Sequence, residues 1–106
     1  MSKWFRAELR FLPAKNWLHP QFAPKVLTGS RTHRWPWDLG ARRYTEGEVN
    51  DAGVTLLDRA ELNPGEAAMA RIEPLFPERW VNVKSGDVIR AGLGFAEATI
   101  LEVADE

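Results

Sequence analysis

The sequence predicts an all-β protein, specifically a closed antiparallel Greek-key-like β-barrel of six or seven strands. Two observations lead to this fold class: short segments in which apolar and polar residues alternate, and turns rich in proline and glycine between them. A third is that no segment repeats its apolar residues with the period of a helix. With 106 residues, of which 44% are apolar, the chain can build one core, so a single barrel domain is expected over residues 1–106.

The first expected strand covers residues 4–12. Alternate residues from Ala7 to Phe11 are apolar and the residues between them are charged, which is the pattern of a half-buried strand. Pro13 ends this strand, and the prolines that follow are typical of a long loop over residues 14–24.

Proline and glycine divide the rest of the chain into further short strands. Asn63-Pro64-Gly65 has proline and glycine at the two central positions of a type II turn, which need a fixed negative φ and a positive φ. In the strand after it, Ala68, Ala70 and Ile72 share one face, and their small size indicates a crowded barrel interior. The other strands are expected at residues 25–28, 53–58, 67–73, 79–83, 88–91 and 96–103.

Composition indicates the cellular compartment in which the protein works. The chain has no cysteine, which excludes disulfides and thiolate metal sites and fits a reducing compartment. The N-terminal residues form no signal-peptide hydrophobic stretch, and no run approaches the roughly 20 apolar residues of a membrane span. We therefore expect a cytoplasmic protein with no membrane partner.

Charge is distributed unevenly along the chain. Residues 1–50 carry nine Lys or Arg against four Asp or Glu, whereas residues 51–106 carry five against eleven. This asymmetry predicts either a basic face for an anionic partner or mutual attraction of the two halves within the fold.

Five short motifs, taken in order, resemble the third, C-terminal β-barrel domain of elongation factor Tu over nearly the whole chain. They are Phe5–Leu12, His19-Pro20-Gln21-Phe22 with Pro24, Asn63-Pro64-Gly65-Glu66, Leu75-Phe76-Pro77, and Ile89-Arg90-x-Gly92 with Ala96-x-Ala98-x-Ile100. The resemblance implies a barrel related to translation. It also implies tRNA-facing positions at His19 and Gly92. The glycine pair and arginine of the family's last loop are replaced here by Gly92-Leu93-Gly94, which removes the arginine.

An inserted arm or long hairpin is expected at about residues 31–50, where the chain is longer than the related domain. The arm holds arginines interleaved with aromatic residues: Arg31, Arg34, Trp35, Trp37, Arg42, Arg43 and Tyr44. Arginines pair with phosphates and aromatic rings stack on unpaired bases, so this composition predicts single-stranded RNA binding. It equally suits a protein interface. The third possibility is that Trp35 and Trp37 pin the hairpin to the barrel while the arginines stay solvated.

Sequence signals for catalysis are weak. The chain has no cysteine nucleophile, no serine in a nucleophile elbow and no phosphate-binding loop, so we expect no enzyme and no nucleotide hydrolysis. Its two histidines and scattered carboxylates have no metal-ligand spacing, and we expect neither a metal nor another cofactor.

The leading hypothesis is a non-catalytic module that docks through the arm to RNA or to a translation-associated protein. The alternative is a protein-only partner, such as a toxin-neutralising or competitor protein.

Overall fold

The computed structural model describes residues 3–39 and 50–105, and nearly all of its regular structure is β-strand. The strands are β1 (Lys3–Phe11), β2 (Leu27–Thr28), β3 (His33–Asp38), β4 (Asp51–Leu56), β5 (Glu61–Leu62), β6 (Ala67–Pro74), β7 (Val88–Ala91) and β8 (Ala96–Asp105). Three short 3₁₀ turns are η1 (Ala14–Asn16), η2 (Pro20–Phe22) and η3 (Pro77–Arg79). Within the described ranges, no helix is long and apolar enough to cross a membrane.

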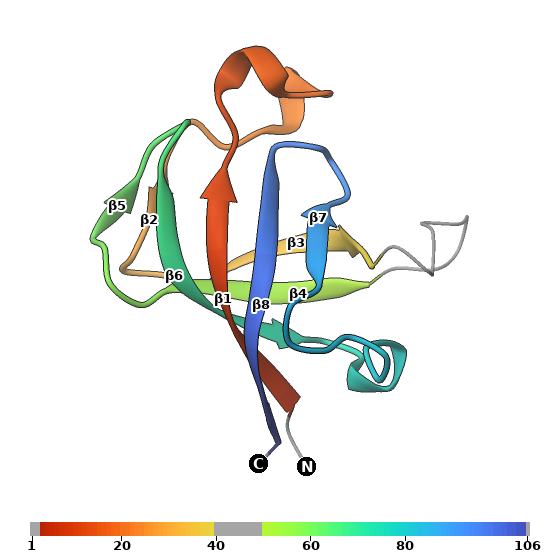
Figure 1. The fold of residues 1–106 in the computed structure, drawn as a ribbon. Helices are drawn as coiled ribbons and strands as arrows, with labels where there is room; N and C mark the ends of the chain where they lie inside the picture. Colours follow the sequence, from red (N-terminus) through yellow and green to blue (C-terminus); the bar gives the residue numbers. More distant parts are fainter. Residues whose placement is uncertain (1–2, 40–49, 106) are drawn as a thin grey trace.

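Six strands close into an antiparallel barrel in the order β1-β6-β4-β3-β7-β8, with β8 pairing back onto β1 (Figure 1). Strands β3, β4 and β6 follow one another as neighbours, and β1 reaches its place beside β6 through a long connection, which is a Greek-key arrangement. The short strands β2 and β5 pair separately from the barrel. The expected fold class, a closed antiparallel barrel of six or seven strands, is confirmed.

Alternation in the sequence decides which side chains enter the barrel. In β1, Phe5, Ala7, Leu9 and Phe11 are buried, while the charged residues between them are exposed. The predicted inward face of β6 is also confirmed, because its alternate residues from Ala68 to Ile72 are buried. Many interior positions are alanine, and the remaining volume is filled by large rings: Phe5, Phe11, Trp37, Trp80 and Phe95.

The predicted turn at Asn63-Pro64-Gly65 forms as expected. Gly65 has a φ of +90°, a conformation that glycine adopts without the steric cost other residues meet. The Glu66 amide donates to the Asn63 carbonyl oxygen at 3.0 Å, which closes the turn. The Gly65 amide also donates to the Phe11 carbonyl at 2.7 Å, so the turn is fastened to the end of β1.

Two sequence predictions differ from the structure. The inserted arm or long hairpin expected at about residues 31–50 begins within the barrel, because His33–Asp38 form β3, which pairs with β4 as one side of a hairpin and with β7 on its other edge. The rest of the expected arm, from residue 40 to 49, lies outside the described residues. The edge strand expected at residues 79–83 is absent, because η3 and successive turns carry the chain past a buried Trp80.

Candidate protein interface

The two tryptophans predicted to stack on RNA bases lie inside the barrel. Trp37 is 0% exposed and Trp35 is 8% exposed. The Trp35 ring packs edge-on against Phe95 with centroids 4.8 Å apart, and it tilts against Trp37 at 6.0 Å. The expectation that these rings are exposed beside the arginines is therefore wrong, since the alternation of β3 turns both rings inward. The third possibility, in which the tryptophans hold a hairpin and the arginines stay solvated, agrees best with the structure. Both rings are buried and Arg34 is exposed, although the rings belong to a barrel strand.

Of the four arginines predicted for the same site, the structure describes two. Arg31 and Arg34 are exposed, Arg31 just before β3 and Arg34 on its outer face. Arg42, Arg43 and Tyr44 lie outside the described residues. The structure thus brings no aromatic stacking surface to Arg34 from Trp35 or Trp37.

The two positions implied by the family resemblance, His19 and Gly92, lie in loops. His19 is exposed and precedes η2. Gly92 follows β7, and its amide donates to the Pro36 carbonyl at 2.8 Å, which ties this loop to β3. The positive φ in this loop belongs to Gly94, not to Gly92, so backbone geometry does not require glycine at residue 92.

A different feature stands out at one end of the barrel, in the connection between β6 and β7. A hollow of about 320 Å³ opens there, and we call it the β6–β7 hollow. Apolar side chains supply much of its lining, and three polar residues lie among them. The lining residues are Leu39, Arg79, Asn82, Val83, Asp87, Val88 and Ile89.

Exposed apolar side chains continue from this hollow onto the surface around it. Val88, one of its lining residues, is 54% exposed, and Val81, next to Asn82, is 65% exposed. Phe76 is partly exposed and lies against the Arg79 guanidinium, 4.8 Å from its ring centroid. Leu101 completes the set on the adjacent strand β8. We call Phe76, Val81, Val88 and Leu101 the apolar rim.

Leu101 faces outward because side chains alternate along β8 and Ile100 before it is buried, and it also lies in a β-bulge. Arg6 pairs with Glu102 and Ala7 pairs with Ile100, so Leu101 is the extra residue of β8. The Ser85 hydroxyl donates to the Leu101 carbonyl at 2.9 Å, which holds the chain before β7 beside this bulge. Val88 is opposite Thr99 in the β7–β8 ladder, so Val88 and Leu101 are diagonal neighbours on the outer face.

The connection that carries the rim is held firmly. Trp80 is fully buried and packs against Phe5 with ring centroids 5.5 Å apart. The Val83 amide donates to the Trp80 carbonyl at 3.1 Å, and the Asp87 carboxylate accepts from the Lys84 amide at 3.1 Å. These bonds preorganise the rim, which lowers the entropy lost when a partner binds.

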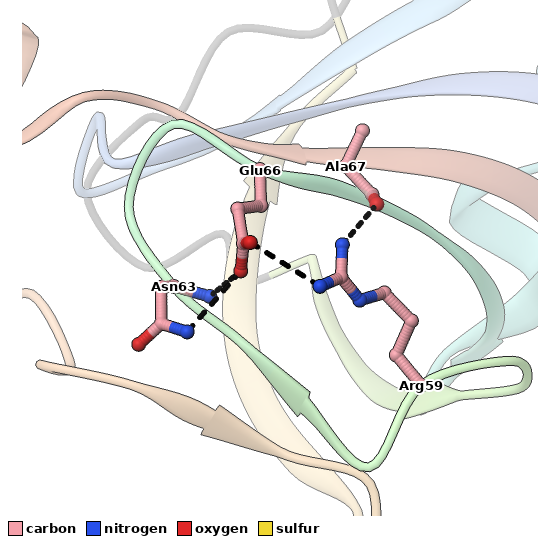
Figure 2. A network of polar contacts seen from close by, with 4 residues as sticks. All are labelled: Arg59, Asn63, Glu66 and Ala67. Carbon is pink, nitrogen blue, oxygen red and sulfur yellow. Dashed lines mark hydrogen bonds and ion pairs between the residues drawn. The ribbon is translucent and has the colours of Figure 1, made fainter.

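A polar network at the opposite loop cluster fixes the β5–β6 turn (Figure 2). Glu66 accepts from the Asn63 backbone amide at 2.7 Å and from its side-chain amide at 3.2 Å. Arg59 pairs with Glu66 at 3.2 Å and donates to the Ala67 carbonyl at 3.4 Å. The hydrogen bond from the Asn63 amide is the main cause that lowers the pKa of Glu66 below its ordinary value of 4.5. Because the polar groups of this network hydrogen-bond to one another, the network stabilises a turn and leaves few donors or acceptors for a ligand.

Charges on the outer wall of β1 and β8 are largely balanced in pairs. Arg6 pairs with Glu102, and Glu97 lies between Arg10, at 3.1 Å, and Arg90, at 3.8 Å. This wall therefore presents no continuous basic stripe of the kind that tracks a nucleic-acid backbone. In the described part of the chain, no group of three or more His, Cys, Asp or Glu is placed to hold a metal ion.

The sequence predictions missed the apolar rim, although a signal for part of it exists. Val88 and Ile89 are adjacent, as are Ile100 and Leu101, so one member of each pair must face outward in a strand. Such outward apolar residues could have been noted. The bulge and the hydrogen bonds that bring them together could not, because they depend on pairing between distant segments.

No protein-family model matches this chain, and no curated protein matches it either. The resemblance to the third domain of elongation factor Tu thus rests on the order of its short motifs alone. The barrel architecture agrees with that resemblance without identifying the family, since many unrelated proteins share such folds.

Proposed function

We propose that this protein is a non-catalytic module that binds another protein through the β6–β7 hollow and its apolar rim. The observation that carries the proposal is that Val81 and Val88, both more than half exposed, border a hollow on a firmly held connection. Protein interfaces combine a buried apolar centre with a polar edge. Here Arg79, Asn82 and Asp87 supply the polar groups. The partner segment contributes an apolar side chain that enters the hollow.

Protein binding is favoured over docking to single-stranded RNA. RNA binding by stacking needs aromatic faces beside phosphate-binding arginines. The interior position of Trp35 and Trp37 removes two of the three rings on which that hypothesis depended, and the third, Tyr44, lies outside the described residues.

The resemblance to elongation factor Tu suggests translation-associated proteins as the first partners to test. A toxin or a competitor of such a protein is the alternative within the same class. The absence of cysteine supports a cytoplasmic location for this interaction.

The test places a photo-crosslinking amino acid at Val88, and at exposed Glu61 of β5 as the matched control. A protein captured from Val88 alone is identified, purified and titrated with the unlabelled chain by calorimetry. Val88→Asp and Leu101→Asp are each expected to weaken binding by about 2 kcal/mol, or roughly thirtyfold, as for interface hot spots.

Lys25→Ala, which removes an exposed lysine before β2 and away from the hollow, should leave the affinity nearly unchanged. Each variant is first checked for native far-ultraviolet circular dichroism. The proposal fails if both rim variants bind the purified partner as the parent does. It also fails if tRNA binds the folded chain and the rim variants leave that binding intact.

A further inference from the structure

Gly53 is a glycine that its own backbone does not require. It lies inside β4, paired with Arg34 of β3 and Glu73 of β6, and its φ is not positive. A Cβ atom at this position would closely approach a single atom, the Thr32 methyl carbon, at 3.0 Å. Glycine inside a strand is less stable than alanine, and it often marks a place where a ligand approaches the backbone.

A second hollow, of about 330 Å³, lies on the outer face of the barrel over this glycine. It belongs to β3, β4 and β6 and is distinct from the β6–β7 hollow. Its lining residues are Thr32, Arg34, Gly53, Glu73, Pro74 and Leu75, so we call it the Gly53 hollow. The missing side chain at residue 53 exposes the strand backbone between Arg34 on one side and Glu73 on the other.

Charges around the Gly53 hollow are unequal. The Glu73 carboxylate is held by Arg71 Nε at 2.9 Å, and the Arg71 guanidinium lies over the Trp4 ring, 4.3 Å from its centroid. Arg34 is exposed and forms no ion pair with any residue in the described ranges. Arg34 is therefore the uncompensated charge on the lining.

Hydroxyl groups extend the polar side of the hollow next to Arg34. The Thr32 and Thr55 hydroxyls are 2.9 Å apart, and because one donates to the other, a proton of the pair remains available to a ligand. Exposed Arg31 precedes Thr32 in the chain and adds a second positive charge at this end. A guanidinium with a neighbouring hydroxyl is suited to bind a carboxylate.

We propose that the Gly53 hollow is a second docking site, which takes an acidic segment of a partner protein. A side chain of that segment packs over Gly53, and its carboxylate pairs with Arg34 and accepts a hydrogen bond from Thr32. Pro74 and Leu75 contact the apolar part of the segment. This site does not depend on the β6–β7 hollow, and either could bind without the other.

The charges of the surrounding carboxylates favour an acidic peptide over a nucleic acid. Glu73 lines the hollow, and Asp51 lies two residues before Gly53 on the same face of β4. A single carboxylate at the Arg34 end avoids both groups, whereas the continuous phosphates of a nucleic acid would meet them.

The test uses blocked hexapeptides of threonine in which one central residue is replaced by glutamate, by glutamine or by lysine. Each is titrated into the ¹⁵N-labelled chain and followed by heteronuclear correlation NMR, which detects millimolar binding. The glutamate peptide should shift the Thr32, Arg34 and Gly53 amides saturably, while the glutamine and lysine peptides should not. Arg34→Gln should weaken binding by about tenfold, as for a lost charge-assisted hydrogen bond. Gly53→Ala should weaken it by filling the floor of the hollow.

Arg10→Gln on the β1 wall is the matched control and should bind the glutamate peptide as the parent does. If Gly53→Ala does not fold, Arg34→Gln decides the question alone. The proposal is overturned if the glutamate peptide causes no shifts, shifts residues elsewhere, or binds Arg34→Gln unchanged. It is also overturned if hexauridylate shifts the same amides at lower concentration than the peptide.

Discussion

Trp35 and Trp37 fill interior volume that small residues on the neighbouring strands leave open. Trp35 is opposite Ala52 of β4, and Trp37 is opposite Ala91 of β7. Both alanines are buried. Pairing one large with one small residue across a ladder lets a narrow barrel pack densely without strain.

The first prediction concerns Trp37, whose ring is fully buried. Trp37→Ala should lower the free energy of unfolding by about 3–5 kcal/mol, because it leaves a large cavity in a packed core. Urea denaturation followed by circular dichroism measures this loss. Arg34→Ala, the outward neighbour on the same strand, should change it by about 0.5 kcal/mol or less. Equal, small losses in both variants would contradict the inward position of Trp37.

The same residue shows what composition could not decide. Arginines beside tryptophans fit RNA binding, protein binding or a core strand with a charged outer face. The choice among these three depends on how β3 pairs with β4 and β7, and both of those strands come later in the chain. The alternation over residues 33–38 indicates a strand with one inner face, but it does not give the strand's neighbours.

At the scale of elements, strands with clear alternation were predictable and the irregular ones were not. The strands β1, β6 and β8 begin or end within a few residues of the predicted ranges. Strand β3 was missed because Pro36 interrupts it, and proline is normally excluded from central strands. Here the Pro36 carbonyl still accepts from Gly92, so the proline removes at most one ladder bond.

The second prediction concerns the turn between β5 and β6. The pKa of Glu66 is lowered in the folded chain, chiefly by the Asn63 amide hydrogen bond, so the folded carboxyl binds its proton less tightly than the unfolded one. Its stabilisation is present above the ordinary pKa of 4.5 and is lost as pH falls through the lower folded value.

Glu66→Gln should therefore destabilise the fold at pH 7 and progressively less as pH falls below 5. Urea denaturation of both proteins across pH 7 to about 3 measures the difference. Two parallel curves of unfolding free energy against pH would show that the Glu66 contacts do not favour its ionised form.

At the scale of the whole molecule, closure of the barrel joins the ends of the described chain. Strands β1 and β8 pair along their length, from Phe11 opposite Ala96 to Lys3 opposite Asp105 (Figure 1). The sequence predicted closure in general terms, from many short strands with turns between them. It could not give the strand order or the surfaces, because the two hollows arise where segments far apart in sequence meet.

The third prediction uses this closure. A circular permutant begins at Asn16, runs to the C-terminus and continues through a flexible linker into residues 1–15. Lys3 and Asp105 are paired and so lie roughly 5 Å apart. A linker of about six glycine and serine residues, with a root-mean-square reach of roughly 13 Å, is long enough to join the two ends. The new ends fall in η1, which is exposed.

The permutant should keep the β-rich circular dichroism spectrum and unfold in one cooperative transition. It should also refold faster than the parent, since the β1–β8 pairing changes from the longest-range contact of the chain to a local hairpin. Stopped-flow refolding from urea measures the rates. A permutant opened instead between Ala70 and Arg71, inside β6, with the same linker is the control, and it should fold poorly because the cut divides a strand paired on both sides. Failure of the permutant that begins at Asn16 to fold, even with the linker doubled, would mean that β8 does not close the barrel against β1.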